Sequence, residues 1–260
     1  MVRMAETAGA PVSLEIDGQV AIVTLTRPDR RNALDADVCR ALTAALQDAA
    51  AAATAGAAGA ARVVLLRGEG PAFCAGANLK GGVYADDFFE ALGTMLTTVT
   101  DLPLPVIADI QGPAVGAGCQ LALACDLRVM GPKARVWVPA VQHGFALDPW
   151  TVARAVELLG GSVARNVLIA GAQVGQQAAV ASGFAMLGGD SVDALETARA
   201  VAGQAPLPTA YFKRALNNQD PDELTASSLE AQAAACWASE DVLEARRARA
   251  ERRTPVFGGR

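Results

Sequence analysis

The chain has 260 residues, 52% of them hydrophobic and 19% charged, and its formal net charge at pH 7 is −5. These values predict a folded protein with a substantial core, built as one large domain or as a domain with an extension, and they exclude a disordered chain. The negative charge argues against a nucleic-acid surface, no apolar run approaches membrane-span length, and the N-terminus lacks an apolar signal region, so we expect a cytoplasmic protein.

The first predicted elements are a β-hairpin and a helix. Residues 12–16 and 20–25 are β-rich runs on either side of an Asp-Gly pair at 17–18, which favours a hairpin turn. Asp35 is a suitable N-cap for a helix that extends to about residue 53. The N-terminal part is therefore expected to supply two paired strands followed by a helix.

Two further β-rich runs, at residues 63–67 and 105–110, are expected to be buried strands. The second run leads into a turn with Gly116 and Gly118, and a buried helix is expected over residues 121–125. A strand that enters a helix through a Gly-rich turn leaves backbone N–H groups unpaired, and such groups can hold an anion or a developing oxyanion. The simpler interpretation is a tight turn in which glycine serves packing.

The C-terminal third has a different pattern. From Ser162 onward the sequence is almost wholly helical in character. Alternating strands and helices followed by helices alone indicate an α/β fold with a helical extension. We place the core at residues 1–195 and the helical region at residues 196–260.

The sequence offers little for a metal site. Its five cysteines form no Cys-x-x-Cys pair, so free buried thiols are the favoured interpretation. The single histidine, His143, falls in an expected loop and is interpreted as an ordinary hydrogen-bonded residue. No bound metal is therefore expected.

Three motifs in order along the chain carry a family resemblance. They are Arg27-Pro28 with Asn32-Ala33-Leu34, then Phe73-Cys-Ala-Gly-Ala-Asn-Leu79, then Gly112-Pro-Ala-Val-Gly-Ala-Gly-Cys-Gln120. In this order and spacing they make the chain, from residue 12 to 257, resemble the enoyl-CoA hydratase/isomerase (crotonase) superfamily. The resemblance implies a crotonase-like β-β-α spiral core and a C-terminal helical region for assembly into a homotrimer or a dimer of trimers. It also implies an acyl-CoA thioester as ligand, with no cofactor beyond the coenzyme A of that ligand.

The same resemblance assigns binding positions. In the superfamily two backbone N–H groups hold the thioester oxygen, and the matching residues are Ala77 and Ala117, the latter in place of the usual glycine. Since backbone donors depend little on the side chain, this oxyanion hole is expected to persist. Unless they serve packing alone, the residues expected to bind coenzyme A and the acyl chain are Ala33, Leu34, Ala75, Asn78 and Leu79.

The catalytic positions differ from the family pattern. Hydratases of the superfamily transfer the proton with two glutamates, and the matching positions hold Gln120 and Ala140. Glutamine can orient a water but accepts no proton near pH 7, and alanine has no proton chemistry. The usual aspartate of the first loop is also changed, to Asn78. Hydratase activity is therefore expected to be very low or absent.

One carboxylate remains near these positions, Asp148. Because Pro149 follows it, the first interpretation is a helix N-cap. The alternative is catalysis or contact with the acyl tail, since the dehalogenase and isomerase branches place a carboxylate in this region. The surrounding stretch, with Gln120 and no second glutamate, resembles an actinobacterial group of hydratase-like proteins that bind long-chain acyl-CoA.

Three functions stay open on the sequence. The first is a non-catalytic acyl-CoA-binding protein of fatty-acid and lipid metabolism. The second is an isomerase or other crotonase enzyme that uses Asp148 as acid or base, and the third is a weak enoyl-CoA hydratase. Gln120 and Ala140 argue against the third, and Asp148 alone favours the second over the first.

Overall fold

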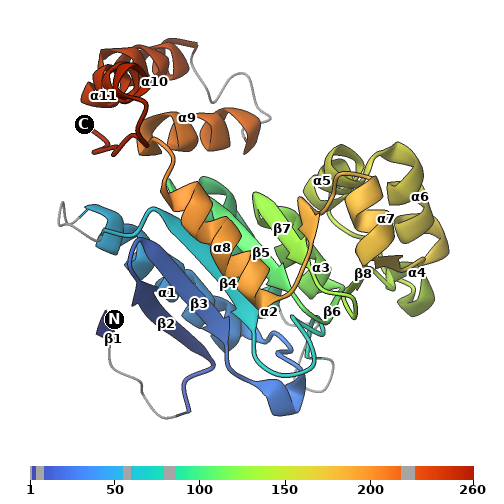
Figure 1. Cartoon of the computed structure of the whole chain (residues 1–260). Coiled ribbons are helices and arrows are strands. Elements are labelled where there is room, and N and C mark those ends of the chain that lie inside the picture. The colour runs from blue at the N-terminus through green and yellow to red at the C-terminus, as the bar shows by residue number, and fades with distance from the viewer. Residues whose placement is uncertain (1, 4–8, 55–59, 79–85, 218–225) are drawn as a thin grey trace.

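The computed structural model describes residues 2–3, 9–54, 60–78, 86–217 and 226–260, and the strands of this part form one large and one small sheet (Figure 1). The strands of the large sheet, in spatial order, are β1 (Val2–Arg3), β2 (Val12–Asp17), β3 (Val20–Leu25), β4 (Val63–Gly68), β5 (Val106–Ile110), β7 (Leu127–Met130) and β10 (Leu187–Gly188). The first three strands pair antiparallel and the others pair in parallel. The small sheet consists of β6 (Pro113–Val115), β8 (Arg135–Trp137) and β9 (Val174–Gly175).

Helices cover both faces of the large sheet. The α-helices of the described residues are α1 (Ala36–Thr54), α2 (Asp86–Asp101), α3 (Ala117–Ala124), α4 (Ala140–His143), α5 (Pro149–Leu159), α6 (Gly161–Ala170), α7 (Gln176–Ala181), α8 (Ser191–Ala202), α9 (Pro206–Asn217), α10 (Ala226–Ala238) and α11 (Glu240–Glu251). In Figure 1, α8 lies across one face, α1 and α2 lie behind the other, and α9, α10 and α11 stand beyond the sheet. The predicted α/β class is confirmed.

The hairpin and the first helix form where the sequence predicts them. β2 and β3 are antiparallel with Asp17 opposite Val20, and Gly18 in the turn has φ 60°. The Asp35 carboxylate accepts a hydrogen bond from the backbone N–H of Val38 at 3.1 Å, so it caps the first turn of α1. Both local predictions are confirmed.

Helix α3 begins one turn earlier than the sequence predicts. It starts at Ala117, directly after Gly116, which has φ 53° and makes the turn. Gly118 lies inside the helix, where a Cβ atom would stand 2.3 Å from the backbone oxygen of Cys74. This glycine therefore allows close approach of the helix to the 73–78 loop, a packing role that the sequence pattern could not separate from a turn.

The C-terminal part is less uniformly helical than predicted. Two short strands, β9 and β10, interrupt it, and β10 extends the large sheet by pairing in parallel with β7. The prediction of an almost wholly helical pattern from residue 162 is wrong at these strands. Each strand has only two residues, which is too short to show an alternating pattern in the sequence. Residue 195, the predicted boundary, lies inside α8, which packs on the sheet. The division into two regions stays a prediction.

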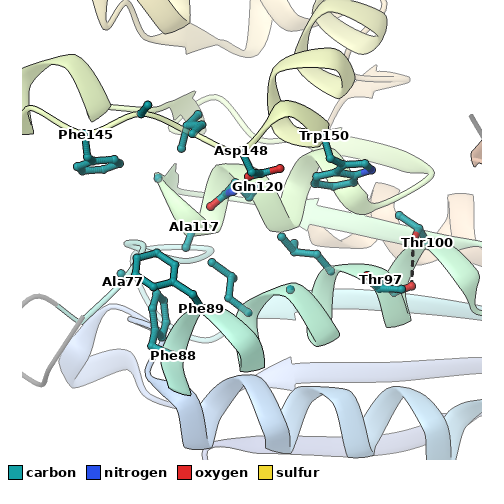
Figure 2. A pocket seen from close by; sticks show the side chains of 16 residues that line it. Ala77, Phe88, Phe89, Thr97, Thr100, Ala117, Gln120, Phe145, Asp148 and Trp150 are labelled. Atoms are coloured by element: carbon teal, nitrogen blue, oxygen red, sulfur yellow. Dashed lines mark hydrogen bonds between the residues drawn. The ribbon is translucent and has the colours of Figure 1, made fainter. Parts of the chain in front are cut away.

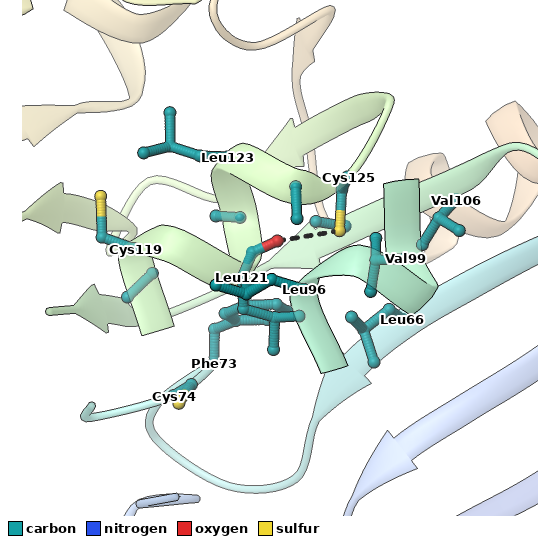
Figure 3. Packing of buried hydrophobic residues seen from close by; sticks show 14 of the residues in the cluster. Leu66, Phe73, Cys74, Leu96, Val99, Val106, Cys119, Leu121, Leu123 and Cys125 are labelled. Carbon is teal, nitrogen blue, oxygen red and sulfur yellow. Dashed lines mark hydrogen bonds between the residues drawn. The ribbon is translucent and has the colours of Figure 1, made fainter. Parts of the chain in front are cut away.

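A tight contact joins α2 and α3. Figure 3 shows Leu96 and Val99 of α2 close to Leu121 of α3, with Phe73 and Leu66 beside them. Leu121 is fully buried and Phe73 is 1% exposed. Because buried side chains pack at crystal-like density, this contact sets the spacing of the two helices.

A buried cation anchors α9 to the core. Lys213 Nζ lies 2.8 Å from Asp126 Oδ2 and donates hydrogen bonds to the backbone oxygens of Val99 and Leu104, both at 2.8 Å. Burial lowers the pKa of Lys213, although the carboxylate of Asp126 opposes this shift. The ammonium group therefore ties the C-terminal helices to the end of α2.

The five cysteines are free thiols, as the sequence predicts, and four of them are buried, whereas Cys236 is only partly buried. Burial raises the pKa of Cys39, Cys74, Cys119 and Cys125 to about 12, so these thiols stay protonated at neutral pH. Among the described residues, no group of three or more His, Cys, Asp or Glu side chains is arranged to hold a metal ion. Within the same part of the chain, every helix is too short or too polar to cross a bilayer.

Candidate functional site

A cavity of about 560 Å³ lies between α2, the start of α3 and the loop that leads into α5 (Figure 2). The described residues that line it are Ala77, Phe88, Phe89, Leu92, Gly93, Leu96, Thr97, Thr100, Gly116, Ala117, Gln120, Phe145, Ala146, Leu147, Asp148 and Trp150. At Thr97, Thr100 and Trp150 it adjoins a second cavity of about 970 Å³ between α2, α9 and α10. A pocket of this size with a mostly apolar wall suits an apolar ligand with a few polar groups.

Ala77 reaches the cavity on a loop that is held on both sides of this residue. The N–H of Leu34 donates to the oxygen of Gly76 at 2.8 Å, and the N–H of Asn78 donates to the oxygen of Leu34 at 2.7 Å. Leu34 and Ala77 therefore form a parallel β-bridge, in which Leu34 bonds to Gly76 and Asn78, the two neighbours of Ala77. The N–H of Ala77 itself points away from Leu34.

Ala117 supplies a second backbone N–H group, from the first turn of α3. The first N–H groups of a helix have no partner inside it. The two segments approach closely, because a Cβ atom at Gly76 would lie 2.6 Å from the Val115 oxygen and 3.7 Å from the Ala117 nitrogen. Gly76 is therefore needed for this approach, and Ala77 and Ala117 line the same cavity (Figure 2).

The start of α3 also has a favourable electrostatic character. The aligned peptide dipoles place a partial positive charge at a helix N-terminus, and α3 is buried along its whole length. Two backbone donors beside this helix end suit an oxygen that carries or develops negative charge.

On the cavity wall, Gln120 and Asp148 form a closed hydrogen-bonded group with Thr151, which lies behind them. Gln120 Nε2 donates to Asp148 Oδ2 at 3.1 Å and to Thr151 Oγ1 at 2.8 Å. The Thr151 hydroxyl donates in turn to Asp148 Oδ2 at 2.6 Å. Gln120 is 6% exposed and Thr151 is fully buried, so this group holds the amide in place away from bulk water.

Asp148 caps α5 as the sequence predicts. Its Oδ1 accepts from the backbone N–H of Thr151 at 2.9 Å, and Pro149 is the first helical residue. Both carboxylate oxygens therefore have partners, Oδ1 in the cap and Oδ2 in the contact with Gln120. Among the described residues that line the cavity, Asp148 is the one titratable side chain.

Several predicted site residues lie off the cavity wall. Leu34 is fully buried in the core, and the side chain of Asn78 hydrogen-bonds to Asp35. Burial raises the pKa of Asp35, but hydrogen bonds and the charge of Arg27, 2.8 Å away, outweigh this and hold the pKa below its ordinary value. Asn78 thus belongs to a group that supports the start of α1.

The remaining predicted residues are also not brought to the cavity. Ala33 and Ala75 are half-buried in neighbouring segments, and Ala140 is buried as the first residue of α4. Leu79 lies outside the described residues. A role of Ala33, Leu34, Ala75, Asn78 and Leu79 in binding coenzyme A and the acyl chain stays a prediction, as does the assignment of Ala140 to the position of the second glutamate.

The sequence pattern did not indicate Thr151 or the wall formed by α2 and α5 as parts of the site. A signal for Thr151 was available, because the third residue after an N-cap often returns its side chain to the cap. Phe88, Leu92 and Leu96 recur at helical spacing and predict a helix, but spacing does not tell whether a face meets core or cavity. Nothing in the sequence indicated that Trp150 lines the cavity.

The enoyl-CoA hydratase/isomerase family matches residues 15–260. The chain is 38% identical over 240 residues to "Probable enoyl-CoA hydratase echA6" of Mycobacterium tuberculosis, which covers 92% of this chain and 96% of that protein. It is 32% identical over 213 residues to "Enoyl-CoA isomerase/hydratase fer4" of Mycosarcoma maydis, which covers 76% of this chain and 77% of that protein.

Solved structures show the same fold. The crystal structure of an enoyl-CoA hydratase/carnithine racemase from Magnetospirillum magneticum gives a TM-score of 0.86 at 27% identity, with 96% of each chain covered. An enoyl-CoA hydratase from Bacillus anthracis gives a TM-score of 0.81 at 26% identity and covers 96% of this chain and 100% of that chain. Similarity over nearly the whole length, in both sequence and fold, shows that the chain belongs to the enoyl-CoA hydratase/isomerase (crotonase) family.

Proposed function

We propose that the protein binds acyl-CoA thioesters in fatty-acid or lipid metabolism and hydrates 2-enoyl-CoA very poorly or not at all. The backbone N–H groups of Ala77 and Ala117 would hold the thioester oxygen, and the acyl chain would lie in the apolar cavity beyond them. Coenzyme A is part of this ligand, and binding needs no other cofactor. The names of the similar proteins, which refer to enoyl-CoA, support this ligand class.

The observation that carries the proposal is the amide at position 120. Addition of water to a 2-enoyl thioester needs a group that accepts a proton from the water. Gln120 accepts no proton near neutral pH, and its Nε2 is already bonded to Asp148 and Thr151. Ala140, at the position of the family's second glutamate, has no proton chemistry. Binding therefore persists in this proposal while the hydration step lacks both of its groups.

Removal of one oxyanion donor tests the first part of the proposal, that the protein binds acyl-CoA through these backbone groups. Proline is tolerated as the first residue of a helix but has no N–H, so Ala117→Pro removes this donor from the first position of α3. We expect acyl-CoA affinity to fall about tenfold, as for one lost hydrogen bond. The matched control is Gly161→Pro at the first position of α6, which is outside the cavity and should keep wild-type affinity.

A pair of measurements on the wild type tests the whole proposal. Calorimetric titration with a saturated acyl-CoA should show binding, and a crotonyl-CoA hydration assay at high protein concentration should show almost no product. Hydration at ordinary enzyme turnover, roughly 1–1,000 per second, would refute the non-catalytic half. Absence of acyl-CoA binding would refute the proposal altogether.

A second candidate function is an isomerase or hydratase that uses Asp148 as acid or base. The observation in its favour is that this carboxylate lines the cavity that also contains Ala77 and Ala117. Its test is an isomerase assay on 3-enoyl-CoA with wild type and Asp148→Asn. Activity that disappears in the variant, while acyl-CoA affinity and folding persist, would establish this candidate.

A further inference from the structure

The second cavity, of about 970 Å³ between α2, α9 and α10, has no part in the proposed function. It adjoins the first cavity at Thr97, Thr100 and Trp150, which line both. The wall of the first cavity is mostly apolar, so a ligand that extends into the second meets a different surface. The polar side chains on the described wall of the second cavity are those of Thr97, Thr100, Asp101, Tyr211, Lys213, Arg214, Asn217 and Gln232.

The first cavity is long enough to keep the two ends of such a ligand apart. Ala77 and Phe88 lie at one end of it, and Thr100 and Trp150 lie at the other (Figure 2). Helix α2 runs along this cavity, and the twelve residue steps from Phe88 to Thr100 correspond to about 18 Å of helix. An extended acyl chain of about sixteen carbons has a comparable length. A chain of half that length ends inside the apolar part.

Trp150 presents an unpaired donor where the two cavities meet. Its side chain is half-buried, and its indole N–H has no hydrogen-bond partner among the described residues. Figure 2 shows this nitrogen on the side of the ring that is turned away from Gln120 and towards Thr100. An indole N–H only donates, and a buried one usually has a partner. A ligand oxygen at this point would supply the missing acceptor.

Arg214 adds a second donor to the wall of the second cavity. The part of the chain that the structure describes gives its guanidinium group no ion-pair partner. The neighbouring cation, Lys213, is already paired with Asp126 at 2.8 Å. Asp101 is the one carboxylate on the described wall, and its Oδ1 accepts from the Thr100 hydroxyl at 3.1 Å. Because guanidinium and indole groups only donate, they suit an oxygen that accepts, in a hydroxyl or in a carboxylate.

We propose that the second cavity binds the far end of a long acyl chain that carries a terminal hydroxyl or carboxylate, and that Trp150 and Arg214 select this end. The proposal rests on the proposed function, because Ala77 and Ala117 must hold the thioester at the other end. One hydrogen bond of ordinary strength corresponds to about tenfold tighter binding than that of a chain ending in a methyl group. On a shorter chain the same hydroxyl would lie against the apolar wall of the first cavity and would weaken binding.

The experiment compares the affinities of five thioesters by calorimetry, below the concentrations at which they form micelles. They are octanoyl-CoA, 8-hydroxyoctanoyl-CoA, hexadecanoyl-CoA, 16-hydroxyhexadecanoyl-CoA and hexadecanedioyl-CoA. At least one of the two long compounds with a terminal oxygen should bind about tenfold more tightly than hexadecanoyl-CoA. The 8-hydroxy compound should bind more weakly than octanoyl-CoA, because its hydroxyl reaches only the apolar wall.

The outcomes separate this proposal from the proposed function. Binding of none of the five would refute the proposed function. Binding of hexadecanoyl-CoA at least as tightly as both of its oxygen-bearing analogues would refute only the role of the second cavity. A gain of equal size for 8-hydroxyoctanoyl-CoA over octanoyl-CoA would assign the effect to general polarity and would refute that role as well.

Two variants, each with a matched control, locate the selection. Trp150→Phe keeps a ring without the N–H and should reduce the preference for a terminal oxygen, whereas Trp237→Phe, at a side chain 76% exposed on α10, should keep it. Arg214→Met should weaken the binding of hexadecanedioyl-CoA alone, and Arg165→Met, at an exposed residue of α6, should change none of the ratios.

The wild-type ratios decide the proposal even if a variant fails to fold. A preference that survives intact in both folded proteins, Trp150→Phe and Arg214→Met, would overturn the assignment to these residues.

Discussion

The two carboxylate oxygens of Asp148 have different hydrogen-bond partners, and these partners determine how much stability a substitution of Asp148 removes. Considered only as a helix cap, asparagine ranks with aspartate. In the structure, however, Oδ1 serves the cap while Oδ2 accepts from Gln120 and Thr151. An asparagine that keeps the cap would place its NH₂ group against these two donors.

We therefore predict that Asp148→Asn lowers the free energy of unfolding by about 1 kcal/mol and Asp148→Ala by about 2 kcal/mol. The control is Asp190→Asn at the cap of α8, where Oδ1 alone accepts from Val192 and Asp193, so the change should cost little. Urea denaturation of the purified variants measures all three values. Equal stability of Asp148→Asn and wild type would show that the contact with Gln120 contributes nothing.

At the scale of residues, the sequence predicted local roles well and distant contacts poorly. The cap at Asp148 and the cap at Asp35 follow from neighbours a few positions away. The bond between Gln120 and Asp148 joins residues 28 positions apart. No local pattern reports such a bond, so the orientation of the Gln120 amide became visible only in the fold.

Helix α3 depends on a glycine in its interior. Gly118→Ala would place a methyl group 2.3 Å from the Cys74 oxygen, so the helix or the 73–78 loop must move. We predict a loss of about 1–3 kcal/mol in the free energy of unfolding, typical of an overpacked core, together with weaker acyl-CoA binding. Gly93→Ala in the interior of α2 is the control, because its Cβ meets nothing within 4 Å. Thermal denaturation should show Gly93→Ala at least as stable as wild type, since alanine favours helix.

The contact of α9 with the core includes one buried cation, Lys213, beside the hydrogen bonds of Asn217. Lys213→Met would leave the Asp126 carboxylate and two backbone oxygens without this partner, and we predict a loss of about 3 kcal/mol. The control is Arg199→Met, which breaks an exposed ion pair with Asp17 and should cost less than about 1 kcal/mol. Chemical denaturation measures both. A loss of similar size in the two variants would contradict an anchoring role for Lys213.

Among helices and strands, the sequence predicted those that are long enough to show a periodic pattern. Helix α5 begins at Pro149, directly after the predicted cap Asp148, and ends at Leu159 before two glycines. Strands β9 and β10 have two residues each and gave no signal. The three family motifs predicted which segments meet at Ala77 and Ala117, whereas the wall supplied by α2 depends on how the helices pack.

The chain as a whole leaves large apolar side chains exposed on its C-terminal helices. Phe212 and Leu216 on α9 are 59% and 68% exposed, Trp237 on α10 is 76% exposed, and Leu243 on α11 is 57% exposed. Phe212 and Leu216 are four residues apart and share one helix face. Large apolar side chains exposed together on one helix face, as on α9, mark a surface that binds another protein chain.

We predict that copies of this chain cover these surfaces and form a trimer or a dimer of trimers. Sedimentation at micromolar concentration should give the mass of three or six chains for wild type. Trp237→Glu would place a charge in the contact and should shift the distribution towards monomer, while its circular dichroism stays that of the folded chain. Val192→Glu, at a residue 64% exposed on α8, is the control and should keep the wild-type mass. A monomeric wild type would rule out this assembly. It would also mean that apolar side chains of this size remain in contact with water.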